Sequence, residues 1–238
     1  MSIYPSVRHA FEDLARWLHH SHDVNQTLSM LTASALETIP GVDHVSITVR
    51  ERRGRLSTLA PTDLLAVAID DLQYELREGP CYEAALEGEG VLLATDLAHD
   101  QRWPAYGPRA AALGVGSQMG LSLVADGGSR AVLNLYSERV GGFDDDREMA
   151  ELFASHAALV LGYARTVKDL DEAINSRTVI GQAIGILMER YDLDEDRAFG
   201  FLTRVSQTSN VKLRQVAREL VEAVNAQRNR GEGPRRSR

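Results

Sequence analysis

The stretch SRTVIGQAIGILMERYDLDEDRAFGFLTRVSQTSNVKLRQVARELV, residues 176–221, decides the fold of the C-terminal part of this 238-residue chain. Its apolar residues recur at steps of three and four, the period of one helix face. A first helix is expected to end near Tyr191, and Asp194 is a suitable N-cap for a second. A polar turn over 207–210 precedes a third helix beginning near Lys212. The pattern predicts a bundle of three short helices.

This stretch resembles an ANTAR domain, the three-helix RNA-binding output module of bacterial transcription antitermination regulators. The residues that carry the likeness are Gln182-Ala-Ile-Gly-Ile-Leu-Met-Glu-Arg190, then Ala198-Phe199 and Leu202, and Asn210-Val-Lys-Leu-Arg-Gln-Val-Ala217. One position departs from the family. Many members have a Lys where this chain has Ile184, so any RNA contact made by that Lys does not carry over.

The resemblance implies binding to RNA hairpins in nascent transcripts. Phosphates supply most of the affinity for a nucleic acid and unpaired loop bases supply specificity, so basic and amide side chains are the expected contacts. The resemblance also implies a homodimer that holds paired hairpin loops and prevents an intrinsic terminator from forming. The candidate RNA-binding residues, each of which is also typical of an ordinary solvated helix surface, are Arg177, Gln182, Arg190, Arg204, Asn210, Lys212, Arg214 and Arg218.

The charge of the chain is unevenly distributed. Residues 1–165 contain 13 basic and 23 acidic side chains, a net charge of −10, whereas residues 166–238 contain 13 basic and 11 acidic ones, a net charge of +2. An acidic front and a mildly basic rear are typical of a sensor joined to a nucleic-acid module, although a basic tail on an acidic enzyme gives the same asymmetry. Residues 226–238 lack apolar anchors past Gln227 and are predicted to be disordered.

The first 165 residues alternate between helix and strand patterns. Two helices are expected over 6–38, followed by paired strands, further helices from Asp63, a strand at 91–94, a helix from Trp103 and a hairpin whose turn lies at 126–129. Acidic residues 144–146 then open a long helix. This order predicts an α+β fold with one antiparallel sheet flanked by helices.

This region resembles a GAF domain, a small-molecule sensor fold. The likeness is carried by Glu78-Gly-Pro-Cys81 and by the paired strands Leu121–Val124 and Val132–Tyr136. The expected organisation is therefore an α+β GAF sensor domain, then a long helix leading into an all-α three-helix ANTAR bundle. The expected bounds are 10–165 for the sensor, 166–225 for the coiled-coil linker and ANTAR domain, whose core is about 171–223, and 226–238 for the tail.

Cys81 and Trp103 are the candidate residues of a possible sensor site, and no cofactor is expected beyond an unidentified ligand. Cys81 is the only cysteine, which excludes a disulfide within the chain and a multi-thiolate metal site, and disfavours sulfoxide-reductase chemistry. Its position at the start of a helix would favour a reactive thiolate, but nearby glutamates oppose this, so packing is the favoured interpretation over redox activity. The pair Asp70-Asp71 is interpreted as solvent-facing carboxylates on a helix.

A heptad seam of about two repeats is predicted in the long helix, at Val160, Tyr163, Val167, Leu170 and Ile174. It favours a parallel homodimer over a helix that packs only on its own domain. No phosphate-binding loop, Gly-x-Ser-x-Gly elbow or His-Glu-x-x-His motif is present, so an enzyme is not expected.

No signal peptide or membrane span is expected either, which places the protein in the cytoplasm. Two alternatives to RNA binding remain open. The second and third helices could form a DNA-binding helix-turn-helix, although the predicted 207–211 connection is longer than the usual turn of three to four residues. A GAF ligand or redox sensor could also act through protein partners.

Overall fold

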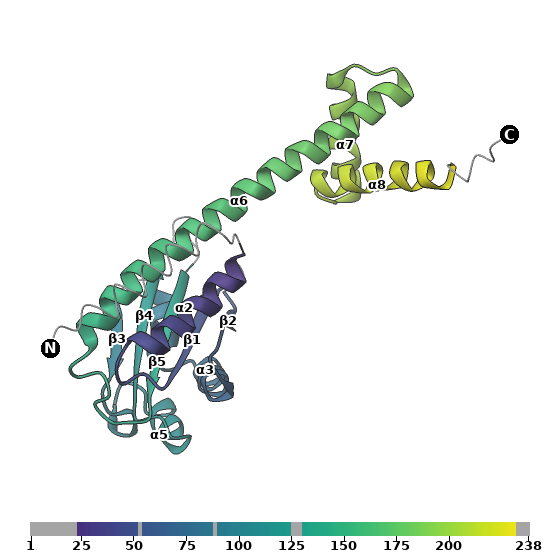
Figure 1. Ribbon diagram of the computed structural model, residues 1–238. Helices are drawn as coiled ribbons and strands as arrows, with labels where there is room; N and C mark the ends of the chain where they lie inside the picture. The colour runs from purple at the N-terminus through teal and green to yellow at the C-terminus, as the bar shows by residue number, and fades with distance from the viewer. Residues whose placement is uncertain (1–22, 52–53, 88–89, 125–129, 232–238) are drawn as a thin grey trace. The chain divides into compact units, whose positions relative to one another are not determined.

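The structure, a computed structural model, describes residues 23–51, 54–87, 90–124 and 130–231 (Figure 1). The helix predicted before residue 23, the turn at 126–129 and the end of the tail, 232–238, lie outside the described residues. The chain divides into two units, residues 1–168 and 169–238, and each is described by itself.

The first unit contains the predicted antiparallel sheet, which has five strands in the order β2-β1-β5-β4-β3. Central strand β5 pairs with β1, where Val45 lies opposite Leu135, and with β4, where Met119 lies opposite the same Leu135. The register thus aligns one row of apolar side chains across the sheet. The strands are β1 (His44–Arg50), β2 (Leu56–Leu59), β3 (Val91–Ala94), β4 (Ser117–Val124) and β5 (Arg130–Ser137).

Helices α2 (Val24–Thr38) and α6 (Arg147–Tyr191) contribute to the apolar core on one face of this sheet (Figure 1). Successive strand residues point to opposite faces, so Val45, Ile47 and Leu135 meet Leu31 of α2 and Phe153 of α6 in this core. Only the first part of α6 takes part. Its last turns belong to the second unit.

Helices α3 (Leu64–Leu76), α4 (Pro80–Glu87) and α5 (Tyr106–Ala112), with the 3₁₀ turn η1 (Leu97–His99), pack against the other face. Asp63 is the N-cap of α3, as predicted, and its carboxylate accepts hydrogen bonds from the N–H groups of Leu65 and Ala66. Helix α5 begins three residues later than Trp103, where the sequence placed its start.

The second unit is the predicted bundle of three helices, formed by the end of α6, α7 (Glu195–Ser209) and α8 (Leu213–Gly231). Asp194 caps α7, accepting a 2.8 Å hydrogen bond from the N–H of Arg197. The buried residues at its centre are Ala183, Leu187, Ala198, Leu202 and Ala217, so small side chains bring the helices together.

Two boundaries in this unit differ from the prediction. Residues 207–209 are the last turn of α7 rather than part of a loop, and Asn210 ends the helix in a left-handed conformation with φ 54°. The connection to α8 is therefore the three residues 210–212. Helix α8 also continues to Gly231, beyond residue 226 where the tail was expected to begin. Among the described residues, no helix is both long and apolar enough to cross a membrane.

Candidate nucleic-acid interface and sensor interior

The structure places every candidate RNA-binding residue on the surface of the second unit. Arg177, Gln182 and Arg190 are exposed on α6, and Arg204 is exposed on α7. The others, Asn210, Lys212, Arg214 and Arg218, are exposed on the connection and on α8.

Two of these cations also have protein partners. Arg214 Nη1 lies 3.2 Å from Glu172 Oε2, and Arg190 Nη2 donates a 3.4 Å hydrogen bond to Gln227 Oε1. Exposed pairs of this kind contribute at most about 1 kcal/mol, so both cations remain able to exchange their partner for a phosphate.

Ile184, at the position where the family often has a Lys, is partly buried and packs against the core of the bundle. This side chain adds apolar contact between helices. The departure from the family pattern therefore exchanges a potential phosphate contact for packing.

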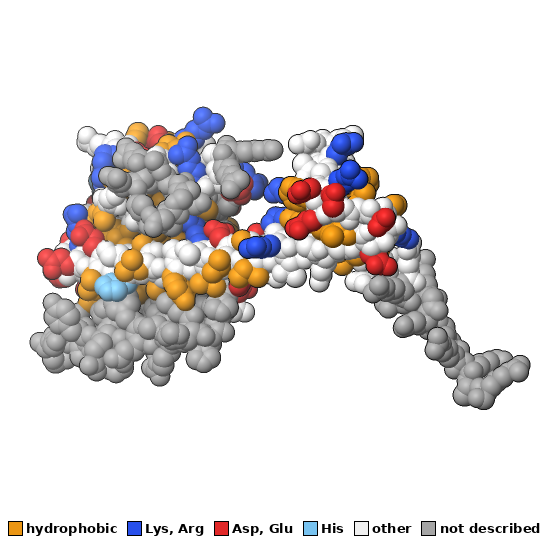
Figure 2. Space-filling model, turned by 90° about the horizontal axis from the view of Figure 1, so that it is seen from above, with side chains coloured by type: hydrophobic (Ala, Val, Ile, Leu, Met, Phe, Trp, Pro, Cys, Tyr) orange, Lys and Arg blue, Asp and Glu red, His pale blue; other side chains and the backbone are white. Residues whose placement is uncertain are grey.

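The residues of the predicted dimer seam differ in their exposure. Tyr163, Leu170 and Ile174 are more than half exposed, but Val160 is only 9 % exposed and belongs to the sensor core. Val160 is therefore not available to a partner, because α6 uses that side to cover its own sheet. Its neighbour Leu159 is 72 % exposed. Figure 2 shows apolar side chains in a row along the part of α6 that belongs to the first unit.

The sensor interior contains a layer of polar side chains on the sheet face opposite α2 and α6. Asp70 and Gln73 of α3 are fully buried, contrary to the prediction of a solvent-facing Asp70; only its neighbour Asp71 is exposed. The strand residues of this layer, all fully buried, are Ser46, Thr48, Gln118, Asn134 and Tyr136.

The Asp70 carboxylate is the centre of this layer. Its Oδ2 accepts hydrogen bonds from Ser46 (2.7 Å) and Thr58 (2.9 Å), and its Oδ1 accepts from Asn134 Nδ2 (3.2 Å) and the hydroxyl of Tyr136. Burial raises the pKa of Asp70 from 3.8 to about 6, although the hydrogen bonds from Tyr136, Ser46 and Thr58 act in the opposite direction. The loss of solvation of the charged carboxylate therefore raises the pKa of Asp70 by more than the hydrogen bonds lower it.

Cys81 is fully buried beside this layer. Its Sγ lies 2.9 Å from Thr48 Oγ1, and its backbone N–H donates a 2.9 Å hydrogen bond to Gln73 Oε1. Burial, followed by the charge of Asp70, raises the pKa of the Cys81 thiol well above its ordinary value. The geometry agrees with the packing interpretation of this residue and opposes a reactive thiolate.

The Glu78-Gly-Pro-Cys81 motif joins three helices. Gly79 has φ +118°, and a Cβ there would lie 2.4 Å from Gln73 Oε1, so only glycine fits. The Glu78 carboxylate accepts hydrogen bonds of 2.9 and 3.0 Å from the N–H groups of Ala105 and Tyr106 at the start of α5. The motif is accounted for by the connection of α3 and α4 to α5.

Trp103 is also fully buried. Its Nε1 donates a 2.7 Å hydrogen bond to Glu83 Oε1, and the guanidinium of Arg102 lies 4.3 Å from its ring centroid. Trp103 and Cys81 thus have different hydrogen-bond partners.

Sequence reasoning missed the buried amides of this region, where Gln73 Nε2 and Asn134 Oδ1 are unpaired.

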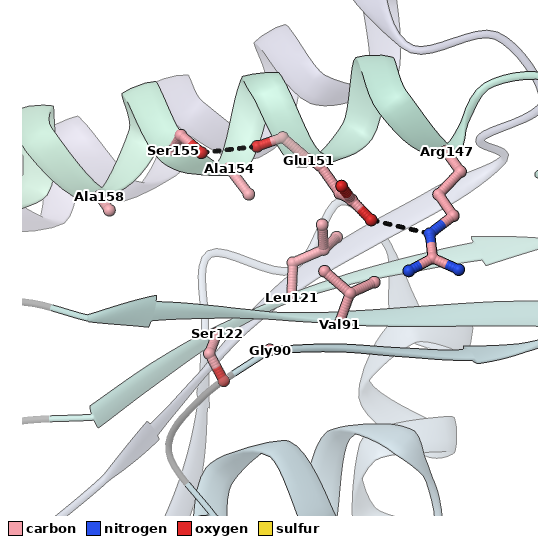
Figure 3. A pocket seen from close by; sticks show the side chains of 9 residues that line it. All are labelled: Gly90, Val91, Leu121, Ser122, Arg147, Glu151, Ala154, Ser155 and Ala158. Carbon is pink, nitrogen blue, oxygen red and sulfur yellow. Dashed lines mark hydrogen bonds and ion pairs between the residues drawn. The ribbon is translucent and has the colours of Figure 1, made fainter.

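A groove of about 420 Å³ lies on the other side of the sheet, between α6 and the edge formed by β3 and β4 (Figure 3). Val91, Leu121 and Ala154 give it apolar walls, and Arg147 and Glu151 form a 2.7 Å ion pair at one end. Its two charges therefore satisfy each other. Within the described ranges, no three His, Cys, Asp or Glu side chains are placed to hold a metal ion.

Solved structures similar to this chain contain the same sensor fold. A GAF domain of a phosphoenolpyruvate-protein phosphotransferase from Coxiella burnetii aligns with TM-score 0.52 and 14% identity, covering 71% of this chain and 99% of that one. The corresponding domain from Acinetobacter aligns with TM-score 0.50 and 15% identity, covering 70% and 98%. A free methionine-R-sulfoxide reductase from Neisseria meningitidis aligns with TM-score 0.51 and 19% identity, covering 67% and 90%.

At these identities the likeness shows the fold alone, and this chain has a single, buried cysteine. No protein of curated function matches the chain. The sequence model of the GAF domain matches residues 21–162, and that of the ANTAR domain matches residues 168–221. The chain therefore belongs to the GAF family and carries an ANTAR domain behind its sensor, in the arrangement of a GAF–ANTAR two-domain regulator.

Proposed function

We propose that this protein is a transcription antitermination regulator whose GAF domain controls a dimeric ANTAR domain that binds RNA hairpin loops. The observation that carries the proposal is the ANTAR match over residues 168–221. The exposure of all eight candidate contact residues on that unit supports it, since phosphate contacts require accessible cations and donors. A partner in nascent transcripts implies a cytoplasmic protein.

The dimer in this proposal uses apolar residues of α6 that are exposed or partly exposed. Val160 is replaced in the proposed seam by Leu159, so that the seam comprises Leu159, Tyr163, Val167, Leu170 and Ile174. Steps of four, four, three and four residues keep these side chains near one side of a helix. Burying them against a second copy would remove exposed apolar surface from water, which is the main driving force for such association.

Control by the GAF domain is assigned to a small ligand or a protein partner in preference to a redox signal. The burial and raised pKa of Cys81 weigh against thiolate chemistry. In favour of a polar ligand, Gln73 Nε2 and Asn134 Oδ1 provide a buried donor and acceptor that lack partners.

A DNA-binding role is the second candidate, and one observation favours it. The connection between α7 and α8 is only residues 210–212, which is the length of a helix-turn-helix turn. The objection that the sequence raised against this role therefore does not hold.

Gel shifts with the full-length protein separate the two candidates. The experiment compares a library of RNA hairpins that have randomised loops with a library of DNA duplexes of equal length. Both libraries are tested at the same salt concentration, because RNA and DNA both bind nonspecifically when salt is low. We expect selection of hairpins with defined loops and no selected duplex. Enrichment of a duplex sequence in place of hairpins would refute the RNA proposal and support the helix-turn-helix.

A further inference from the structure

Helix α7 has two exposed aromatic side chains, Phe199 at 45 % and Phe201 at 50 %. Single exposed aromatics are common on protein surfaces, so exposure alone assigns them no role. Their neighbours on the helix differ, however, and this difference is informative.

Phe201 lies between two arginines on one face of α7. Arg197 is four residues before it and Arg204 three residues after it, the spacings at which helix side chains are adjacent. Both arginines are exposed. Arg197 also forms an ion pair with Asp194, but at 3.5 Å between largely exposed groups this pair is weak.

The surface beside Phe201 is open. Gly200 lies one helical turn from both Arg197 and Arg204, and a Cβ there would meet no heavy atom within 4 Å outside its own stretch of helix, so the surface between the two arginines is uncovered. A flat aromatic side chain, a bare backbone and two flanking cations are thus presented together.

Phe199 has different surroundings. The residues one turn before it are Glu195 and Asp196, and the residue one turn after it is Thr203. The acidic start of α7 gives this side of the helix a charge that repels phosphate. Helix α7 therefore has a basic aromatic face at Phe201 and an acidic one at Phe199.

We propose that Phe201 stacks on an unpaired base of an RNA loop while Arg197 and Arg204 contact the phosphates on either side of it. Every base has an aromatic face, and stacking on a protein ring is a general way to hold an unpaired base. The charge complementarity of the two arginines selects a nucleic acid over an apolar partner. The inference rests on the proposed RNA-binding function. It adds a base contact to α7, where Arg204 was the one candidate RNA-binding residue expected from the sequence.

The test measures binding of a fluorescent RNA hairpin, selected for binding to the wild-type protein, by anisotropy. Phe201→Ala should weaken binding about 5- to 150-fold, the range expected from loss of one stacked base. The slope of log K against log salt should stay unchanged, because no phosphate contact is lost. Arg204→Ala should reduce that slope by about one contact.

Four control variants make the result specific. Phe201→Tyr and Phe201→Trp should keep the affinity, whereas Phe201→Leu, which is apolar but cannot stack in the same way, should not. Phe199→Ala is the matched control on the same helix and should change the affinity less than twofold.

The outcomes are distinguishable. If the wild-type protein selects no hairpin, the proposed function fails. If it binds hairpins and Phe201→Ala binds as tightly as wild type, or Phe199→Ala loses as much, the stacking proposal fails alone. A Phe201→Ala protein that changes from dimer to monomer in light scattering would also overturn it, because the face would then bind a second copy.

Discussion

Replacing Asp70 with Asn should change how the stability of the sensor domain depends on pH. The pKa of Asp70 is raised by burial from 3.8 to about 6 in the folded protein. Between these pH values the folded state keeps a proton that the unfolded state has lost, so the free energy of unfolding falls as pH rises through this window. In the Asp70→Asn protein this decline should be absent.

The size of the effect follows from the shift. A tenfold change in an equilibrium constant is worth about 1.4 kcal/mol. Raising the pKa of Asp70 from 3.8 to about 6 therefore lowers the free energy of unfolding by about 3 kcal/mol in total. About 2 kcal/mol of this decline falls between pH 4 and pH 7. Asp63 and Asp100 have lowered pKa values and act in the opposite direction, but they are common to both proteins. The difference between variant and wild type therefore isolates Asp70.

Urea denaturation, monitored by tryptophan fluorescence, measures the free energy of unfolding without a label. Trp103 is fully buried in the first unit, so its emission reports unfolding of the sensor domain. The free energy of unfolding of Asp70→Asn minus that of wild type should rise by about 2 kcal/mol from pH 4 to pH 7.

Any constant cost of the Asn side chain, such as a poorer fit to the four donors, shifts that difference equally at every pH. It therefore leaves the slope untouched. A difference that is the same at pH 4 and pH 7 would refute the reasoning, because Asp70 would then titrate alike in the folded and unfolded states.

Three further predictions concern the other parts of the molecule. Lys212→Ala with Arg214→Ala should weaken hairpin binding and lower its salt slope by up to about two contacts, and an unchanged slope would mean that neither touches phosphate. Leu170→Asp with Ile174→Asp should give monomers that lose hairpin binding while the sensor domain stays folded, and a dimer persisting in light scattering would place the interface elsewhere. Cys81 should be alkylated slowly in the native protein, with no inflection below about pH 8, because burial raises its pKa; rapid labelling at pH 6 would contradict this.

The order of helices and strands could be predicted because periodicity records which face of each element is buried. The three-helix bundle and the caps Asp63 and Asp194 follow from local patterns of this kind. The end of α7 could not be placed correctly, because the polar residues 207–209 suit a loop as well as an exposed last turn.

The polar interior was missed because polarity was read as exposure. Asp70 and Gln73 are in phase with Ala66 and Ile69 at helical spacing, so they share the buried face of α3, and this was the available signal. Tertiary packing decides the rest, since a strand such as β1 does not reveal whether its polar side faces water or a second layer of helices. Val160 was misplaced for a similar reason: α6 has apolar residues on two sides, and spacing alone does not say which side covers the sheet.

Cys81 is the only cysteine and is buried in the sensor core, so the described surface has no thiol that reacts quickly with a maleimide. A cysteine introduced at an exposed position of α6 outside the proposed seam, such as Lys168, would then be the only fast-reacting thiol on each chain. Spin labels or dyes could be attached there in the otherwise natural sequence, without first removing Cys81 and disturbing its contacts with Thr48 and Gln73. Distances between labelled copies would then map directly onto the helix that links sensing to output.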